Sequence, residues 1–298
     1  MVQRNNYAYG GDAHTAEYYA QYDSTISNGE ARLPICICVD TSSSMSIIIN
    51  DPSEVKEIQG TGRSSDGNNV VSVAPRYPWV KLVTRMDESK KVFSRMLEKM
   101  QANPIIAKAA VICIVTFDQF ADCYAEFTDI SRISPNSPSH IRIGQDRTNA
   151  AKGLRMALER LDQQQMMNSS AGNESYKPVL IFMSDGQPTD GMDAEQLRTE
   201  VRQRSEDGKL NVIPIAIGNG IDERWLRSLS RDSRVYRMNT DREFEEVFDE
   251  ITRKIQQTTM VISVDEDEGN MANDAQDGVA STQYGQDYES FLDEFMNS

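Results

Sequence analysis

The feature that most constrains the fold is the alternation of short apolar runs with amphipathic helical stretches between residues 33 and 257. The apolar runs predict strands at residues 33–39, 110–117, 121–127, 179–183, 211–217 and 235–238. Helices are predicted at residues 87–101, from Thr148, from Asp193, at 222–229 and at 241–257. Strands that alternate with helices predict an α/β domain with a mainly parallel sheet. Because only three residues separate the second strand from the third, these two are expected to pair antiparallel, with the third at the sheet edge.

Local patterns refine these boundaries. The helix at residues 87–101 places five apolar side chains on one face, namely Val92, Phe93, Met96, Leu97 and Met100. Residues 163–177 are polar and are predicted to form a loop. Asp193 and Gln196 have the spacing of a capping box, so the next helix is expected to begin there.

The alternation occupies one main domain, predicted at residues 31–262 of the 298-residue chain. Residues 47–86 interrupt it, and a connection of that length is far beyond the usual two to six residues, so they are predicted to form an insertion. Residues 1–30 are predicted to form a flexible leader. Residues 263–298 are predicted to form an acidic, disordered tail that ends in a short amphipathic helix. The apolar face of this helix is predicted to dock into a groove of a partner protein, and it consists of Tyr288, Phe291, Leu292 and Phe295. The alternatives are that this segment packs on its own domain or supplies an acidic residue to the metal of a neighbouring molecule.

The net charge argues against two classes of partner, nucleic acid and anionic membranes. The formal net charge of −15 disfavours nucleic acid and anionic membranes, which require clustered Lys and Arg. No run approaches the roughly 18 apolar residues that span a bilayer, and the first residues lack the apolar core of a signal peptide. We therefore expect a cytoplasmic protein.

The four cysteines lie in strand-like runs. Cys36, Cys38 and Cys113 fall in apolar sequence and Cys123 in the adjoining run, so buried reduced thiols are predicted. A zinc site built from all four is the alternative, but the paired CxxC spacing that such sites use is absent. His14 and His140 lie in polar sequence and are predicted to be surface residues.

Oxygen-bearing side chains follow two of the predicted strands. Asp40, Ser42 and Ser44 come directly after the first strand, Asp185 follows the strand at residues 179–183, and Thr148 lies at a helix start. In open α/β sheets, chemistry gathers beyond the carboxyl ends of the strands where the strand order reverses. Such a set of oxygen ligands suits Mg²⁺, and also Mn²⁺ or Ca²⁺. Each piece alone also fits a simpler role, because Ser/Asp-rich turns cap helices and Thr148 could be an N-cap.

Three sequence elements resemble, in their order, the metal-ion-dependent adhesion site (MIDAS) of von Willebrand factor type A (vWA) domains. They are the DxSxS motif at Asp40, Ser42 and Ser44, the later Thr148, and the SDGQPTDG sequence around Asp185. The resemblance covers about residues 32–259 and is closest to the bacterial intracellular TerY-like branch. It implies a Rossmann-like open sheet of six strands in the order 3-2-1-4-5-6, mostly parallel with one antiparallel edge strand, and helices on both faces.

The resemblance also implies roles for these residues. Ser42, Ser44 and Thr148 would touch the metal, and Asp40 and Asp185 would ligate it directly or through water. Two departures stand out: Ser43 replaces the usual small Gly, and the insertion lies beside the metal.

The function implied is binding rather than catalysis, since neither His adjoins a motif and no phosphate loop or nucleophile elbow appears. The metal would accept an Asp or Glu of a partner protein. The TerY-like resemblance suggests an adaptor in a stress-response, tellurium-resistance or defence system, with a protein kinase and a PP2C-type phosphatase as partners. A metal-dependent hydrolase and an extracellular vWA adhesin are the alternatives. Within the insertion, Trp79, next to Arg76 and Tyr77, is the predicted partner-binding residue.

Overall fold

A computed structural model describes residues 31–63, 69–144, 147–186, 188–218, 221, 223–237, 248–249 and 252–253. The chain divides into two units, residues 1–256 and 257–298, and all of the described residues belong to the first. The predicted leader, the acidic tail with Tyr288, Phe291, Leu292 and Phe295, His14 and most of the helix predicted at residues 241–257 lie outside the described residues.

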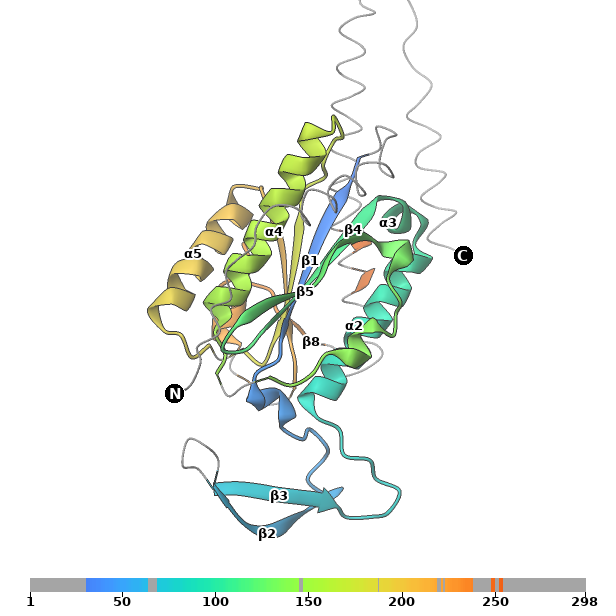
Figure 1. Ribbon diagram of the computed structural model, residues 1–298. Helices are drawn as coiled ribbons and strands as arrows, with labels where there is room; N and C mark the ends of the chain where they lie inside the picture. The colour runs from blue at the N-terminus through green and yellow to red at the C-terminus, as the bar shows by residue number, and fades with distance from the viewer. Residues whose placement is uncertain are drawn as a thin grey trace, which may run out of the picture. The chain divides into compact units, whose positions relative to one another are not determined.

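The main sheet has six strands in the order β5-β4-β1-β6-β7-β8 (Figure 1). The strands are β1 (Leu33–Asp40), β4 (Ala110–Phe117), β5 (Ala121–Asp129), β6 (Val179–Ser184), β7 (Asn211–Ala216) and β8 (Tyr236–Arg237). All neighbours are parallel except β4 and β5, which form the antiparallel edge pair. The predicted strand order and the mostly parallel sheet are therefore confirmed.

Helices cover both faces of this sheet, as predicted (Figure 1). One face carries α2 (Arg85–Ala102) and α3 (Pro104–Ala109). The other face carries α4 (Ala150–Ser170) and α5 (Met192–Glu206), and α6 (Arg224–Arg227) packs into the same core layer. The domain is thus a three-layer α/β sandwich.

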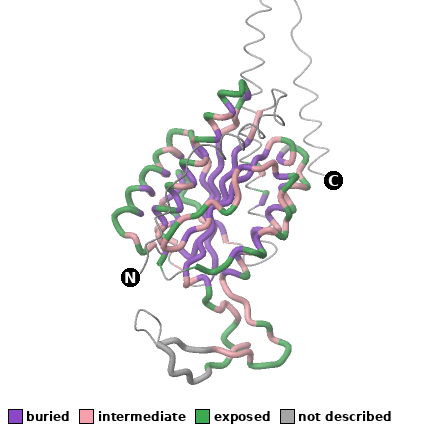
Figure 2. The backbone as a smooth tube through the Cα atoms, in the orientation of Figure 1, coloured by how far each residue is buried: buried purple, intermediate pink, exposed green. Residues whose placement is uncertain are grey.

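The central strand β1 explains how one sheet supports two core layers. Successive side chains of a strand point to opposite faces, so Ile35 and Ile37 pack with the α2 layer while Cys36 and Cys38 pack with the α4 layer. Every residue of β1 is buried, as the central strands in Figure 2 show. A fully buried strand of this kind is typical of a parallel sheet covered on both sides.

The cysteines follow this layering. All four are free, and Cys36, Cys38 and Cys113 are buried as predicted. Cys123 is only partly buried because it lies on the edge strand β5. Its Sγ lies 3.9 Å from that of Cys113 on the neighbouring strand.

Two local predictions were wrong. Helix α4 continues to Ser170, so the polar loop predicted from residue 163 begins only after it; Gln164 and Asn168 are buried and hydrogen-bonded to each other at 2.9 Å. The cap of α5 is Gly191, with no side-chain cap hydrogen bond, rather than the capping box predicted at Asp193. Because Gly191 has φ of +54°, a conformation that favours glycine, the backbone itself makes this turn.

The insertion contains a two-stranded antiparallel sheet, β2 (Val55–Arg63) and β3 (Asn69–Pro75), which the sequence analysis did not predict. A 3₁₀ turn, η1 (Ser43–Ser46), precedes the insertion and α2 follows it. The two ends of the insertion are joined to each other, since Ile49 N donates to Val83 O at 2.9 Å and Arg85 N donates to Ile47 O at 2.9 Å. The insertion is therefore closed at its base, beside η1 and the start of α2, and the hairpin lies beyond that closure (Figure 1).

Among the helices that the structure describes, none combines the length and the apolarity that crossing a membrane requires.

Candidate metal-ion site

The site lies where β1 and β6 end. These strands are parallel neighbours with Val39 opposite Met183, so the residues that follow, Asp40 and Ser184, emerge side by side. Ser184 Oγ donates to Asp40 Oδ2 at 2.7 Å. Asp40 is fully buried and Asp185 is 4% exposed. The structure therefore brings together the two carboxylates that the sequence analysis selected, 145 positions apart in the chain.

The loop after β1 positions the two serines of the DxSxS motif. Ser42 N donates to the other oxygen of Asp40, Oδ1, at 2.8 Å, which folds the chain back over the strand end. Ser42 Oγ and Ser44 Oγ lie 3.0 Å apart. Thr41 attaches this loop to the neighbouring strand β4, because its N and Oγ1 both donate to Phe117 O, at 2.8 and 3.0 Å. Two hydroxyl oxygens are therefore held close together on a loop that is anchored at the centre of the sheet.

Thr148 is placed by contacts with the loop that follows β6. Its N donates to Thr189 Oγ1 at 3.1 Å, and its O accepts from Thr189 N at 2.9 Å. The helix cap is the next residue, Asn149, whose Oδ1 accepts from Lys152 N at 3.1 Å. The simpler role considered for Thr148, an N-cap, is therefore wrong. Thr148 is nonetheless buried, 4% exposed, and attached to the loop that carries Asp185.

Two site residues were missed by the sequence analysis. Asp190 Oδ2 accepts from Ala151 N at 2.7 Å and so caps the start of α4 from the neighbouring loop. The signal for Asp190 was its place in SDGQPTD. Arg85 donates from Nη1 to Asp185 Oδ2 at 2.8 Å. Arg85 gave no signal, because it lies at the end of the insertion and far from either motif in sequence.

The electrostatics of the site are dominated by burial of negative charge. Burial raises the pKa of Asp40 to about 7; the nearby charge of Asp185 adds to this shift, and the hydrogen bonds from Ser42 and Ser184 oppose it. Asp185 Oδ1 is buried and has no hydrogen-bond partner among the described residues. A buried carboxylate oxygen without a donor is costly unless a cation or water reaches it. This unpartnered oxygen, together with the hydroxyls of Ser42 and Ser44 on the loop that is bonded to Asp40, fits a hard divalent cation, which prefers oxygen ligands.

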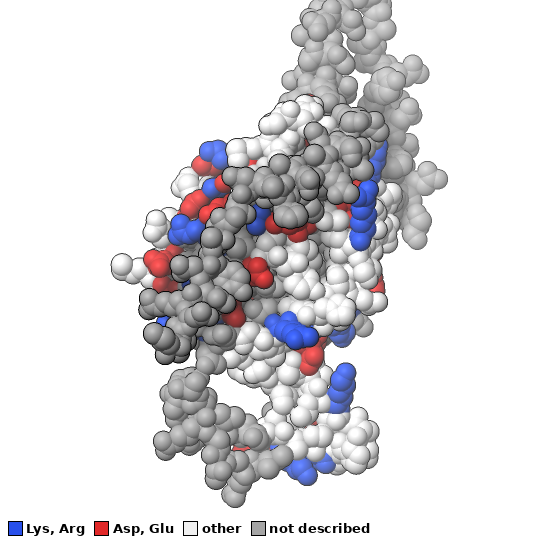
Figure 3. Space-filling view, viewed as in Figure 1, with Lys and Arg blue, Asp and Glu red and all other residues white. Residues whose placement is uncertain are grey.

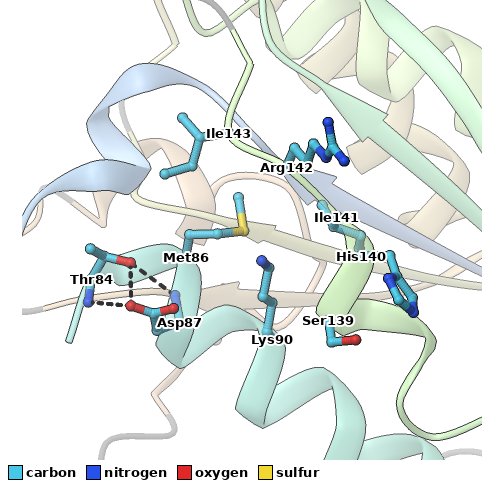
Figure 4. Close-up of a pocket in the computed structure, with 9 residues that line it drawn as sticks. All are labelled: Thr84, Met86, Asp87, Lys90, Ser139, His140, Ile141, Arg142 and Ile143. Atoms are coloured by element: carbon cyan, nitrogen blue, oxygen red, sulfur yellow. Dashed lines mark hydrogen bonds between the residues drawn. The ribbon is translucent and has the colours of Figure 1, made fainter. Parts of the chain in front are cut away.

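A separate pocket of about 520 Å³ lies beside the start of α2 (Figure 4). It is lined by residues of α2, among them Met86 and Lys90, and by the segment from Ser139 to Ile143. Its three basic side chains, Lys90, His140 and Arg142, point in different directions in Figure 4, so they form no converged anion site. His140 is exposed, as predicted. None of the predicted metal-site residues lines this pocket.

The predicted partner-binding residue of the insertion is at the surface. Trp79 is 79% exposed, and its ring stacks on that of Tyr77 with 5.0 Å between centroids. Arg76 is exposed as well, and its Nη2 donates to Val55 O at 3.1 Å. On the face shown in Figure 3, Lys and Arg are interspersed with Asp and Glu.

Comparison with solved structures finds similar chains at low sequence identity. The PilB minor pilin of Streptococcus sanguinis, as its D319A mutant, gives a TM-score of 0.50 at 13% identity, over 80% of this chain and 65% of the pilin. Proximal thread matrix protein 1 of the mussel byssus gives 0.48 at 14% identity, over 76% of this chain, which spans about half (47%) of the mussel protein. BatB of Bacteroides thetaiotaomicron gives 0.43 at 14% identity, over 74% of this chain and 98% of BatB.

No curated protein matches the sequence. A family model does match: residues 84–253, more than half of the chain, fit the von Willebrand factor type A domain. The match includes Thr148 and Asp185 and begins at the end of the insertion, so that the DxSxS residues lie before it. In the structure, however, the strand that carries these residues is at the centre of the same sheet. The chain therefore belongs to the von Willebrand factor type A domain family.

Proposed function

We propose that this protein is a metal-dependent protein-binding adaptor, in which a MIDAS site coordinates an acidic residue of a partner. The observation that carries the proposal is the meeting of Asp40 and Asp185 at adjacent strand ends, with Asp185 Oδ1 buried and lacking a partner within the described residues. The family assignment supports a protein-interaction module.

The residues that would hold the cation are those at the two strand ends and at the start of α4. Ser42, Ser44 and Thr148 offer hydroxyl oxygens, and Asp40 and Asp185 offer carboxylates that ligate directly or through water. Mg²⁺ is the preferred ion for such a set, and Mn²⁺ and Ca²⁺ are also compatible. When bound, the ion supplies a Lewis-acidic coordination position that accepts the partner's Asp or Glu.

The proposal is binding rather than catalysis. Hydrolysis would require a general base beside the site. In the described part of the chain, the groups that hydrogen-bond the side chains of Asp40 and Asp185 include Ser42 N, Ser184 Oγ and Arg85 Nη1, and the proposal assigns the two carboxylates themselves to the ion.

The biological setting is proposed from the motif resemblance. We place the protein in the TerY-like branch, as a cytoplasmic adaptor of a stress-response, tellurium-resistance or defence system, with a protein kinase and a PP2C-type phosphatase as partners. We propose two additional contacts with partners. One is Trp79 on the insertion, and the other is the apolar face of the tail, formed by Tyr288, Phe291, Leu292 and Phe295.

Titration calorimetry with Mg²⁺ and Mn²⁺ tests the metal site. We expect a single site whose affinity falls by roughly a hundredfold in Asp40→Asn and Asp185→Asn, since each removes one negative charge next to the ion. Asp193→Asn is the matched control, because Asp193 is an exposed carboxylate outside the site and should leave affinity unchanged. Unchanged binding in both site variants would show that the carboxylates do not hold the ion.

Affinity capture tests the adaptor role. The full chain, with Mg²⁺ or with a chelator, is compared with Asp185→Asn. Partners that are lost both in the chelator and in the variant are bound through the metal. If the same proteins are retained under all three conditions, binding does not use this site.

A further inference from the structure

Arg85 is the first residue of α2, and its side chain reaches across to the site at the end of β6. Nη1 donates to Asp185 Oδ2 at 2.8 Å, and the two side chains are 14% and 5% exposed. The contact joins residues 100 positions apart. Asp185 therefore uses one oxygen for a guanidinium, while its other oxygen, Oδ1, has no hydrogen-bond partner among the residues described.

The guanidinium is held in this position from several sides. Arg85 N donates to Ile47 O, and the capping box between Thr84 and Asp87 fixes the start of the helix (Figure 4). Gly218, with φ of +97°, lies directly against the side chain: a Cβ there would be 2.7 Å from Arg85 Nε. Nε is itself buried and has no hydrogen-bond partner in the described structure. Arg85 is thus a fixed charge and not a mobile surface arginine.

The helix does not explain why a cation is placed here. The amino end of a helix carries partial positive charge, so a basic residue in the first turn is unfavourable and acidic residues are preferred. The same turn does contain Asp87 and Glu88. The favourable interaction of Arg85 is instead with Asp185, which the proposed function assigns to the divalent cation.

We infer that Arg85 sets the affinity of the site by competing with the divalent cation for the negative charge of Asp185. This inference rests on the proposed function and extends it. Two positive charges that share one carboxylate repel each other. With Arg85 in place, the two ionised carboxylates, the guanidinium and a divalent cation together carry one net positive charge. An acidic residue of a partner neutralises that charge, so the metal and the acidic partner bind cooperatively.

Calorimetry with Mg²⁺ and Mn²⁺ on the full chain tests this competition. Arg85→Gln removes the charge, and we expect the affinity for both ions to rise by about tenfold or more. Arg85→Lys is the matched control, because it keeps the charge and should remain close to the wild type. An affinity that is unchanged or lower in Arg85→Gln would overturn the inference. Arg85→Met, uncharged and of similar length, repeats the measurement in case the Gln variant does not fold.

A second measurement needs no metal. Melting temperatures of the wild type, Arg85→Gln, Asp185→Asn and the double variant are compared in a chelator. Competition requires that Arg85 and Asp185 interact, so the loss in the double variant should be smaller than the sum of the two single losses. Strictly additive losses would contradict the inference.

The two measurements separate this inference from the proposed function. If metal binds and Asp185→Asn abolishes it, but Arg85→Gln leaves it unchanged, only the competition fails. If neither the wild type nor Arg85→Gln binds either ion, the proposed function fails and the competition with it. If the wild type binds weakly and Arg85→Gln binds tightly, both are supported.

Discussion

The segments that leave the neighbouring strands β1 and β6 differ in how they are held. After β6, the loop is bonded to the start of α4 through Thr189 N to Thr148 O at 2.9 Å and Ala151 N to Asp190 Oδ2 at 2.7 Å. After η1, the insertion begins at Ile47, and its two ends are hydrogen-bonded to each other at Ile49 and Val83. Between these ends it contains the β2–β3 hairpin and the exposed rings of Tyr77 and Trp79. The first segment holds Asp185, which we propose binds the ion, on a packed scaffold. In the described part of the insertion, the backbone hydrogen bonds Ile49 N to Val83 O and Arg85 N to Ile47 O close the second segment at its base, so changes at its outer surface should leave the strand ends undisturbed.

The largest effect should come from loosening the scaffold under the β6 loop. Phe182 is fully buried, and its ring lies 5.1 Å from that of Phe117 and 5.7 Å from that of Trp225, measured between centroids. Phe182→Ala should lower the free energy of unfolding by about 3–5 kcal/mol, measured by urea denaturation. Met192→Ala is the control, because Met192 is 87% exposed. A loss as small as that of the control would mean that the packing of Phe182 does not stabilise the domain.

A smaller effect on stability is expected from pH, through the buried carboxylate of Asp40 at the end of β1. The folded-state pKa of Asp40 is about 7 against an ordinary value of 3.8, so folding favours the protonated form. This contribution to stability is fully present below about pH 4 and is lost as the pH rises through 7. In a chelator, the unfolding free energy should therefore fall between pH 5 and pH 7 by up to about 1.4 kcal/mol per pH unit from this group.

Asp40→Asn supplies the control for this pH dependence. The amide does not titrate, so the slope between pH 5 and pH 7 should flatten in the variant. An identical slope in the two proteins would place the titration elsewhere.

The difference between the segments after β1 and β6 also explains what could be predicted from the sequence. The strands and their order followed from apolar runs and from the motif resemblance. Asp40, Ser42, Ser44 and Asp185 were selected because they follow such runs directly, and Thr148 because it lies at a helix start. The end of α4 was not found, because Gln164 and Asn168 look like loop residues until their buried hydrogen bond is seen.

The hairpin and Arg85 were missed for related reasons. The strand pattern of β2 and β3 is broken by a register shift between Ile58 and Gly62 and by the Gly, Ser and Asn residues around it. The partner of Arg85, Asp185, is 100 residues away, so the sequence around Arg85 gives no indication of the contact.

The smallest effect on the fold is expected from replacing residues 51–81, the outer part of the insertion, with a short Gly/Ser linker. Residues 47–50 and 82–85 stay, so the pairing at the base is retained. Because loop closure depends only weakly on length, the free energy of unfolding should change by less than about 1 kcal/mol. Mg²⁺ affinity should also be unchanged, whereas partner capture should weaken, and Trp79→Ala alone should weaken it as well. A large loss of stability would show that the hairpin belongs to the folded core.

The free cysteines of β1, β4 and β5 have a practical consequence for measuring motion in this domain. Burial raises the pKa of Cys38 well above its ordinary value, and contact with Cys113, followed by burial, raises that of Cys123. Alkylating reagents react with the thiolate, so β1 can be labelled only when the strands separate. The rate at which Cys36 and Cys38 are modified would thus report opening of the sheet centre in the unaltered sequence, with no probe introduced, on the timescale of hydrogen exchange.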